Sequence, residues 1–380
     1  MSTSSLRRCQ NAPRCSVRCW PDSQPVHSFA DQWYQERVRV LILGGSWFLG
    51  ATIAEHAIAS GAEVSTFRRG RTGSDITGVH LIKGDRTVAG DVARLAAAGP
   101  WDLVADTGAF VPNQTLNLAR ALEPVADRYL LISSVSAYRD WPVAPLTEDS
   151  PLLDCPADAD DSFGYDADPS PTKYGFGKAG CENAVGEVFG PDRVAILRPG
   201  VILGPREYVG RLEWWLRRME RGGRVLAPGR PDRRIQPIDV RDVADFALTP
   251  GLTGTFNAAA PGTETMADLL ESCHEITGGG ADLEWVTDEV WLAEQGVRQW
   301  TELPLWRTYA GAWAVDASRA RSAGLVTRRL RDTVADTWTW LQSGGASIEH
   351  ERAAELGISP ARERALLGLW DAVEFDHCGA

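Results

Sequence analysis

Apolar and polar positions follow two alternating periods over roughly the first half of the chain. A continuous apolar run at 38–45 has the length of a buried strand, and the next segment, 50–61, has a helical period that closes at Gly61. Strand-like runs recur at 62–67, 80–85, 101–107, 128–134 and 193–200, with helical segments between several of them. Strands that alternate with helices predict an α/β fold, a doubly wound parallel sheet with helices on both faces. A ligand is expected at the carboxyl ends of its strands.

The second half of the chain has a less regular pattern. Helical segments at 211–223, 267–279 and 287–296 predict a smaller C-terminal substrate lobe. The predicted organisation is a disordered tail at 1–36, a dinucleotide-binding Rossmann domain at 37–204, 237–261 and 313–342, a substrate lobe at 205–236 and 262–312, and a C-terminal helical extension at 343–380.

Composition narrows the class of protein. The chain has 380 residues and a net charge of −12, which argues against binding to nucleic acid backbones. No apolar run of about 18 residues occurs, so no membrane association is expected. Seven cysteines without a CxxC pair predict reduced thiols, no metal site and a cytoplasmic protein. Arginine supplies nearly all the positive charge, so the few lysines attract interest: they are Lys83, Lys173 and Lys178.

The stretch LILGGSWFLG, residues 41–50, is typical of a turn that holds a pyrophosphate. In such a turn the glycines allow a tight bend, a close backbone approach and helix packing. Trp47 occupies the usual place of the middle glycine, so its indole either points away from the phosphates, stacks on the ligand or plugs the site. The predicted cofactor residues here are Gly44, Gly45, Ser46, Trp47, Phe48 and Gly50.

Arginines follow the second predicted strand. An NAD-specific fold usually places an acid there for the ribose 2′-hydroxyl, whereas Arg68, Arg69 and Arg71 suit a 2′-phosphate. The expected cofactor is therefore NADP(H), with NAD(H) as the alternative, and a solvated basic loop is the simpler interpretation. Asp85, after the third strand, is expected near the adenine.

Tyr174 and Lys178 lie four residues apart at the start of a helical segment, so they share one face. An ammonium beside a tyrosine stabilises the phenolate, which makes the tyrosine a usable acid and base. Ser134 ends the strand at 128–134 and offers a hydroxyl for a substrate oxygen. The alternative is a surface tyrosine and lysine without a shared role.

These motifs together resemble an extended, atypical short-chain dehydrogenase/reductase of the NAD-dependent epimerase/dehydratase family, in its GGxxFxG branch. The resemblance runs from about Val38 to Leu341 and includes LRPGVILGPRE, IQPIDVRDVADFAL and AVDASRARSAGL. It implies that Ser134 polarises the substrate oxygen, that Tyr174 is the acid/base and that Lys178 is its partner. It also implies that the cofactor is lined by Thr107, Gly108, Pro199 and Gly200. Tyr174 and Lys178 are expected to contact the cofactor too, since the lysine can bond the nicotinamide ribose.

The chain departs from the family pattern in three places. Val135 and Ser136 stand where sugar dehydratases carry an Asp-Glu pair, so dehydration is not expected. Ile235 stands where many sugar-nucleotide enzymes have a diphosphate-binding arginine, although Arg233 and Arg234 precede it. The acidic segment 154–171 is a solvated loop, a lid or a calcium loop. Near the C-terminus, WTELPLW at 300–306 predicts either core packing or the lining of an apolar or ring-shaped substrate, with Glu302 beside it.

Three functions follow. The leading expectation is a reductase that transfers hydride between NADPH and a small carbonyl or alcohol substrate through Ser134, Tyr174 and Lys178. The second is an epimerase of (nucleotide-)sugars with tightly held NAD, and the third is a non-catalytic nucleotide sensor or RNA-associated protein. A homodimer is a further expectation, because related enzymes often pair two helices at their interface.

Overall fold

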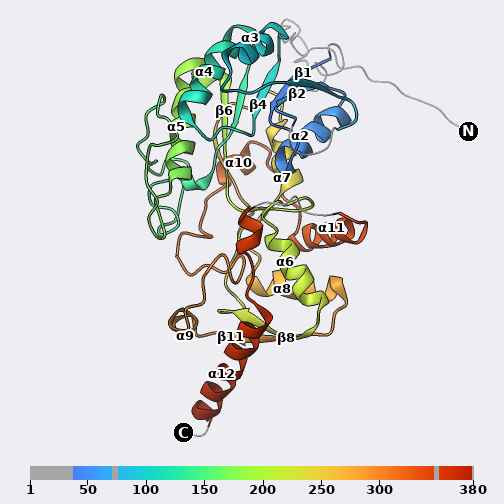
Figure 1. Ribbon diagram of the computed structural model, residues 1–380, viewed down its shortest axis with the longest axis vertical. Coiled ribbons are helices and arrows are strands. Elements are labelled where there is room, and N and C mark those ends of the chain that lie inside the picture. Colours follow the sequence, from blue (N-terminus) through green and yellow to red (C-terminus); the bar gives the residue numbers. More distant parts are fainter. Residues whose placement is uncertain (1–36, 71–75, 346–350, 379–380) are drawn as a thin grey trace, which may run out of the picture.

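The computed structural model describes residues 37–70, 76–345 and 351–378. The expected tail at 1–36 lies outside the described residues. A seven-stranded, fully parallel sheet with the strand order β10-β6-β5-β4-β1-β2-β3 forms the larger part of the molecule (Figure 1). Its strands are β1 (Arg39–Leu43), β2 (Glu63–Arg68), β3 (Val79–Lys83), β4 (Leu103–Asp106), β5 (Tyr129–Ile132), β6 (Val194–Pro199) and β10 (Gly254–Ala258).

Helices cover both faces of this sheet. Alternate residues of β1 show why, because Val40 and Ile42 enter one apolar core and Leu41 and Leu43 enter the other. One face carries α3 (Ala89–Ala97), α4 (Pro112–Leu122) and α5 (Lys173–Phe189); the other carries α2 (Phe48–Ala59), α7 (Val240–Ala247) and α10 (Ser318–Ser322). The predicted doubly wound parallel α/β fold is confirmed.

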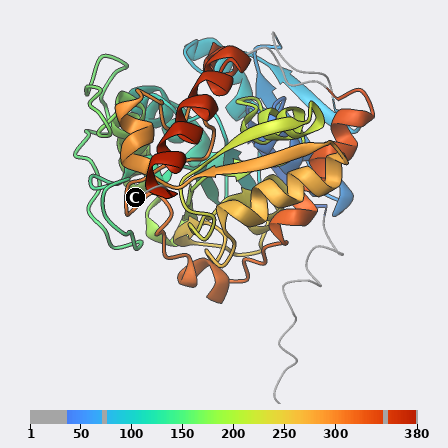
Figure 2. The same ribbon diagram turned by 90° about the horizontal axis from the view of Figure 1, so that it is seen from below.

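A smaller lobe lies below the sheet in Figure 1 and faces the viewer in Figure 2. It contains the two-stranded parallel sheet of β8 and β11, with its own apolar core around Trp215 and Trp306. Its elements are α6 (Arg211–Glu220), β8 (Gly223–Pro228), α8 (Met266–Thr277), β11 (Ala281–Val286), α9 (Glu289–Glu294) and α11 (Leu330–Gln342). The prediction placed α11 in the larger domain, but its apolar side chains pack into the core of the small lobe. The short pair β7 (Ile202–Leu203) and β9 (Ile238–Asp239) belongs to the segments that connect the two parts.

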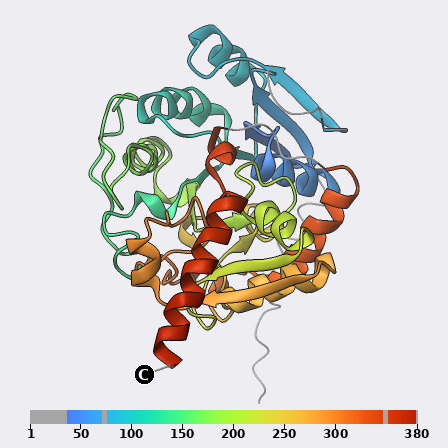
Figure 3. The same cartoon turned by 60° about the horizontal axis from the view of Figure 1, so that its bottom comes forward.

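The final helix, α12 (Pro360–Cys378), runs along the small lobe (Figure 3). The buried carboxylate of Glu363 accepts hydrogen bonds from Arg218 Nε of α6 at 3.0 and 2.9 Å, and Trp370 packs against Trp291 of α9. Detaching α12 would leave Arg218 of α6 without its partner carboxylate, and an unpaired buried charge is strongly destabilising. The ion pair therefore stabilises the packing of α12 on the lobe. Of the helices described, none has the length and apolar character needed to cross a bilayer.

The remaining elements are single helical turns: η1 (Glu123–Val125), η2 (Val135–Ala137), η3 (Pro191–Arg193) and η4 (Glu351–Glu355). Of these, η2 matters for the site, because it follows β5 directly and carries the chain away from the carboxyl edge of the sheet.

Candidate functional site

The turn between β1 and α2 is built from glycines whose positions leave no room for a side chain. Gly44 and Gly45 have φ angles of +107° and +84°, which glycine adopts without strain. A Cβ at Gly44 would lie 2.6 Å from Oγ1 of Thr107, and a Cβ at Gly50 would lie 2.8 Å from the backbone N of Gly45. The backbone of β1, the start of α2 and the end of β4 therefore approach one another as closely as a dinucleotide-binding turn requires.

The start of α2 presents N–H groups suited to an anion. Its N-cap residue, Trp47, has an extended backbone and no side-chain capping bond, and the first turn contains no acidic residue. The first N–H groups of a helix need partners from outside the helix, and the helix dipole adds partial positive charge there. Ser46 precedes Trp47 in this turn, and Phe48 begins the helix with a φ angle of +28°. The arrangement suits a phosphate group.

Trp47 contacts a ring from the segment that leads into the small lobe. Its ring centroid lies 5.8 Å from that of Tyr208 at an interplanar angle of 36°, and Phe48 meets the same tyrosine edge-on at 6.3 Å. Nearby, Arg206 donates two hydrogen bonds to Glu55 of α2, at 2.8 and 2.6 Å. An aromatic cluster and an ion pair thus hold the segment after β7 against the glycine turn between β1 and α2.

The end of β4 contributes a buried charge that the sequence pattern did not single out. Asp106 is fully buried; it accepts hydrogen bonds from Arg86 at 2.8 Å, from the hydroxyl of Tyr129 at 2.8 Å and from the backbone N of Gly108 at 2.9 Å. Burial lowers the pKa of Arg86, but the carboxylate of Asp106 outweighs it and the net shift is upward. Thr107 donates its hydroxyl to the carbonyl of Leu43 at 3.0 Å. The sequence did contain a sign of this buried charge, because Asp106 stands near the end of the apolar run 101–107.

The ends of β2 and β3 bring Arg68 and Asp85 to the same edge of the sheet. The backbone N of Gly84 donates to the carbonyl of Arg68 at 3.1 Å, so the two strand ends are joined. Asp85 accepts hydrogen bonds from the backbone and hydroxyl of Thr87, at 3.0 and 2.8 Å. Arg69 is exposed, whereas Arg71 lies outside the described residues.

Tyr174 and Lys178 lie on the first turns of α5. Thr172 caps this helix by accepting the backbone N–H of Gly175 at 3.0 Å. Tyr174 is 40% exposed, and Lys178 is buried with its Nζ 5.6 Å from the centroid of the Tyr174 ring. Nζ donates a hydrogen bond to the carbonyl of Ile132 at 2.8 Å. Burial lowers the pKa of Lys178 to about 8, because the ammonium has lost most of its water.

Ser134 lies at the carboxyl end of β5, next to the start of α5. Its Oγ accepts the backbone N–H of Ser136 at 3.1 Å, which fixes the hydroxyl at the beginning of η2. A Cβ added at Gly175 would lie 2.3 Å from the carbonyl oxygen of Ser136, so α5 packs directly on this turn. The structure therefore brings the predicted serine, tyrosine and lysine segments together at the carboxyl edge of the sheet.

A buried polar network lies behind these residues. Glu182, one helical turn after Lys178, accepts hydrogen bonds from Arg198 and from the hydroxyl of Ser133. Arg198 also donates to the hydroxyl of Tyr138 at 2.9 Å, and Tyr138 donates to Asn257 of β10 at 2.7 Å. Because α5, β5, β6 and β10 all contribute, the network fixes the depth at which α5 packs on the sheet.

Pro199 and Gly200 end β6 at the same edge. Pro199 is paired with Ala258 in the β6–β10 register, and the backbone N of Gly200 donates to the carbonyl of Ala258 at 3.1 Å. Both residues thus lie at the carboxyl end of a strand next to β5, where a cofactor is expected.

Ile235 and the two arginines before it, Arg233 and Arg234, all make contacts within the protein. Ile235 is 1% exposed and belongs to the core of the small lobe. Arg233 forms an ion pair with Glu289, and Arg234 donates to the carbonyl of Gly262 at 3.1 Å.

A different pair of arginines, Arg307 and Arg211, lies among tryptophans. The Arg307 guanidinium lies 4.8 Å from the ring centroid of Trp141 and 4.9 Å from that of Trp300, and Arg211 lies 5.1 Å from Trp300. Burial lowers the pKa of Arg307, and no ion pair within 4.0 Å involves it in the described part of the chain. Arg211, in contrast, forms an ion pair with Glu207 at 2.9 Å. Trp141 follows η2 closely in the chain, so this cationic, aromatic cluster joins the small lobe to the segment that carries Ser134. Sequence reasoning missed it, since its members lie far apart in the chain.

The stretch 300–306 divides between two roles. Trp306 is buried in the lobe core and donates its Nε1–H to Glu289 at 3.0 Å. Glu302 accepts the backbone N–H of Arg298 at 2.8 Å. Trp300, in contrast, is only partly buried and belongs to the cluster of Arg307.

The acidic loop packs against the start of α5. Asp166 accepts the backbone N–H of Lys173 at 2.9 Å, and Phe163 and Tyr165 contact the ring of Phe176 at 5.9 and 5.4 Å. Among the residues described, no three His, Cys, Asp or Glu side chains are grouped closely enough to hold a metal ion.

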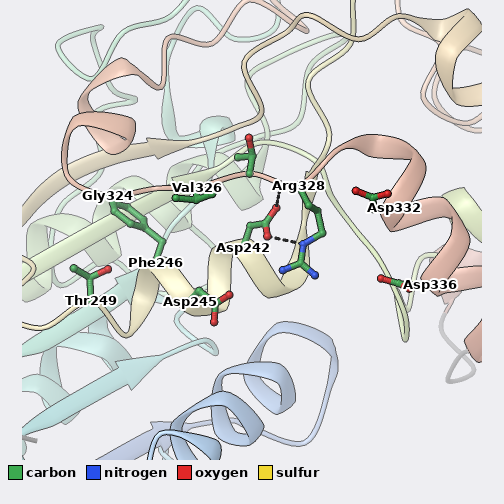
Figure 4. A pocket seen from close by; sticks show the side chains of 10 residues that line it. Asp242, Asp245, Phe246, Thr249, Gly324, Val326, Arg328, Asp332 and Asp336 are labelled. Carbon is green, nitrogen blue, oxygen red and sulfur yellow. Dashed lines mark hydrogen bonds and ion pairs between the residues drawn. The ribbon is translucent and has the colours of Figure 1, made fainter. Parts of the chain in front are cut away.

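An open pocket of about 460 Å³ lies between α7 and α11 (Figure 4). It is lined by acidic side chains, and Asp242 already accepts hydrogen bonds from Arg328 at 2.7 and 2.8 Å. None of the predicted catalytic or cofactor residues lines it. We therefore place the candidate site at the carboxyl edge of the large sheet and not in this pocket.

Comparison with known proteins agrees with this fold. No protein-family model and no curated protein sequence matches the chain. Among solved structures, WbmG of Bordetella bronchiseptica in complex with NAD and UDP is 20% identical, with a TM-score of 0.61 over 83% of this chain and 97% of that one. UDP-glucose 4-epimerase of Thermotoga maritima with UDP-glucose is 16% identical, with a TM-score of 0.61 over 81% of this chain and 99% of that one.

A third similar structure is UDP-N-acetylglucosamine 4-epimerase of Methanobrevibacter ruminantium in complex with UDP-N-acetylmuramic acid. It is 18% identical, with a TM-score of 0.60 over 81% of this chain and 99% of that one. At such identities the similarity establishes the fold. The expected doubly wound parallel sheet is thus shared with WbmG and with these two epimerases.

Proposed function

We propose that the chain is a nicotinamide-dependent enzyme of the extended short-chain dehydrogenase/reductase family that epimerises a sugar carrying a nucleoside diphosphate. The observation that carries the proposal is the pairing of two features. Ser134, Tyr174 and Lys178 lie together at the carboxyl edge of the sheet, and the cationic, aromatic cluster of Arg307 and Trp300 joins the adjoining lobe to the Ser134 segment. The guanidinium of Arg307 suits a phosphate group, and aromatic rings suit a flat base or a sugar face.

Each residue has a distinct role in this mechanism. The turn of Gly44, Gly45 and Gly50 would hold the pyrophosphate of a nicotinamide cofactor, which would supply the reversible hydride chemistry that inversion of a sugar carbon needs. Tyr174 takes the proton from the sugar hydroxyl and later gives it back, while Ser134 holds the same oxygen. Lys178 keeps positive charge beside the phenol ring, which favours the phenolate.

The cofactor turn supports binding of a dinucleotide pyrophosphate, and the second turn bears on the choice of cofactor. Arg68 ends β2 and Arg69 follows it, at a place where a cation favours a ribose 2′-phosphate, so we propose a preference for NADP(H). WbmG, in contrast, was solved with NAD. Titration of cofactor-free protein with NADPH and NADH decides between them, and Arg69→Glu should reverse a preference for NADPH.

Three observations rank the epimerase above the alternatives. The similar structures named above include two 4-epimerases. Arg307 supplies a cation for a diphosphate that a small carbonyl compound would not need. Val135 is buried and has no ionisable group, and Ser136 has a hydroxyl in place of a carboxylate. Neither residue can therefore act as the acid or base of a dehydration.

The test uses the purified chain with its bound nucleotide. We expect acid-released nucleotide to contain NAD or NADP, and the protein to interconvert a UDP-hexose and its epimer without net consumption of cofactor. Tyr174→Phe should lower turnover by about 10²–10⁴-fold with unchanged nucleotide content. Net oxidation of NADPH by a carbonyl compound would instead establish the reductase. Binding of cofactor with no turnover of any UDP-sugar or carbonyl compound would favour the non-catalytic alternative.

A further inference from the structure

Phe110 is a large apolar side chain left open at the candidate site. It follows Thr107 and Gly108 in the loop between β4 and α4, and it is 55% exposed. Exposed single apolar residues are common on protein surfaces, but this one lies at the carboxyl edge of the sheet, beside the proposed catalytic pair.

The ring of Phe110 faces the ammonium of Lys178. Nζ lies 4.5 Å from the ring centroid, and the ring of Tyr174 lies 6.3 Å away at 40°. The close approach of the backbones fixes this arrangement, because a Cβ at Gly177 would lie 2.4 Å from the carbonyl oxygen of Phe110. Glycine at that position lets α5 reach the loop, and the ring then meets the ammonium from the solvent side.

The other groups around Lys178 come from four elements. On its own helix lie Tyr174, Cys181 and Glu182; β4 contributes Asp106, the loop after β3 contributes Arg86, and β5 contributes the carbonyl of Ile132. Burial, the largest cause, lowers the pKa of Lys178 and Arg86 adds to this effect, whereas Cys181, Asp106 and Glu182 raise the pKa. No ion pair within 4.0 Å involves Lys178 in the part of the chain that the structure describes. Its direct contacts that favour the charged form are the carbonyl of Ile132 and two ring faces, of which Phe110 at 4.5 Å is nearer than Tyr174 at 5.6 Å.

We propose that Phe110 is a positioning residue for Lys178. The ring face of Phe110 keeps the Lys178 ammonium charged and next to Tyr174 at the carboxyl edge of the sheet. The effect on turnover rests on the proposed function, whereas the effect on the Lys178 ammonium rests only on its contact with the Phe110 ring. An ammonium over an aromatic face is stabilised by the quadrupole of the ring, more strongly where water is scarce.

Substitutions of Phe110 by side chains of similar size distinguish an effect of the aromatic face from an effect of packing alone. Leucine in place of Phe110 keeps an apolar cover but has no π-face, so the pKa of Lys178 should fall below about 8. Tyrosine or tryptophan keeps the face and should restore the pKa. Phe163→Leu is the matched control, because Phe163 is a 38% exposed aromatic residue whose ring meets Phe176 and not a lysine.

The first readout needs no substrate. The chain contains only three lysines, so protein grown with ¹³C-labelled lysine gives few side-chain signals to titrate by NMR, and Lys83→Arg, Lys173→Arg and Lys178→Arg assign them. We expect Phe110→Leu to lower the pKa of Lys178 by about 0.5 to 1 pH unit, Phe110→Trp to leave it within about 0.2 of the parent, and Phe163→Leu to have no effect. An unchanged pKa in Phe110→Leu, or an equal shift in Phe163→Leu, overturns the proposal.

The second readout links the ring to turnover. In the wild-type protein the alkaline limit of kcat should follow the loss of the Lys178 charge, and Phe110→Leu should move that limit to lower pH by the same amount. If the NMR shift occurs but no UDP-sugar or carbonyl compound is turned over, the proposed function fails and the role of the ring stands. If turnover occurs and its alkaline limit is the same in both proteins, Phe110 does not act through Lys178.

Discussion

The ring of Trp47 lies 5.8 Å from the ring of Tyr208 and is tilted by 36° to it. Trp47 belongs to the cofactor turn, and Tyr208 belongs to the segment that leads into α6. The contact ties the first glycine turn of the sheet to the small lobe, so a bulky residue in the place of a glycine has a packing partner.

Trp47→Gly tests whether the indole blocks or merely borders the cofactor turn. Glycine accepts the extended backbone of this position, so the turn should keep its shape. We expect cofactor affinity to change by less than about tenfold and stability to fall by about 1–2 kcal/mol. Calorimetric titration and urea unfolding measure both. An affinity that rises by more than tenfold would show that the indole occupies the cofactor's place.

Gly50→Ala should disrupt the turn, although alanine is normally the better helix residue. Its Cβ would lie 2.8 Å from the backbone N of Gly45 and 2.9 Å from Oγ1 of Thr107. We expect cofactor affinity to fall by at least about tenfold and stability by about 1–3 kcal/mol. The matched control is Gly186→Ala in α5, where nothing lies within 4 Å of the added Cβ. That variant should be neutral or up to about 1 kcal/mol more stable; equal effects of the two changes would contradict the prediction.

The charge of Lys178 costs stability below pH 8. Burial lowers its pKa from 10.5 to about 8, so between these values the unfolded chain binds more protons than the folded one. Stability from this group therefore rises as the pH increases from 8 to 10.5. Lys178→Met should remove the cost, which amounts to up to about 3 kcal/mol at neutral pH. We expect the variant to be more stable at pH 7, and the difference to shrink by pH 10. A difference that is constant with pH would mean that Lys178 keeps its ordinary pKa in the fold.

Arg307→Leu should separate substrate binding from cofactor binding. The guanidinium lies between Trp141 and Trp300 and is desolvated there. Its loss should weaken binding of a UDP-sugar by at least about tenfold, because a charged hydrogen bond to a phosphate is worth about 1.5–3 kcal/mol. Cofactor affinity should stay the same, as it should for the exposed control Arg329→Leu. Equal weakening of cofactor and UDP-sugar binding would place Arg307 outside the substrate subsite.

The local pattern of the sequence was sufficient for the large sheet. The run 38–45 contains β1 because the apolar stretch 40–43 can be covered on both faces, and the alternation of Leu41 and Ile42 between two cores is the direct result. The Tyr174–Lys178 spacing likewise placed both residues on the first turns of α5. Such features depend on neighbours within a few residues, which the sequence displays.

The tertiary structure decided what surrounds these residues. The charge of Asp106 is matched by Arg86, which comes from the loop after β3 and is 20 residues away in the chain. Arg307 meets Trp141 only because the small lobe folds back onto the segment after η2. The sequence alone determined the periods, the glycine turn and the helical spacing, since these are properties of local backbone geometry. The pairing of Lys178 with Phe110, the cationic cluster and the partner of Trp47 join distant segments, and those contacts depend on how the layers pack.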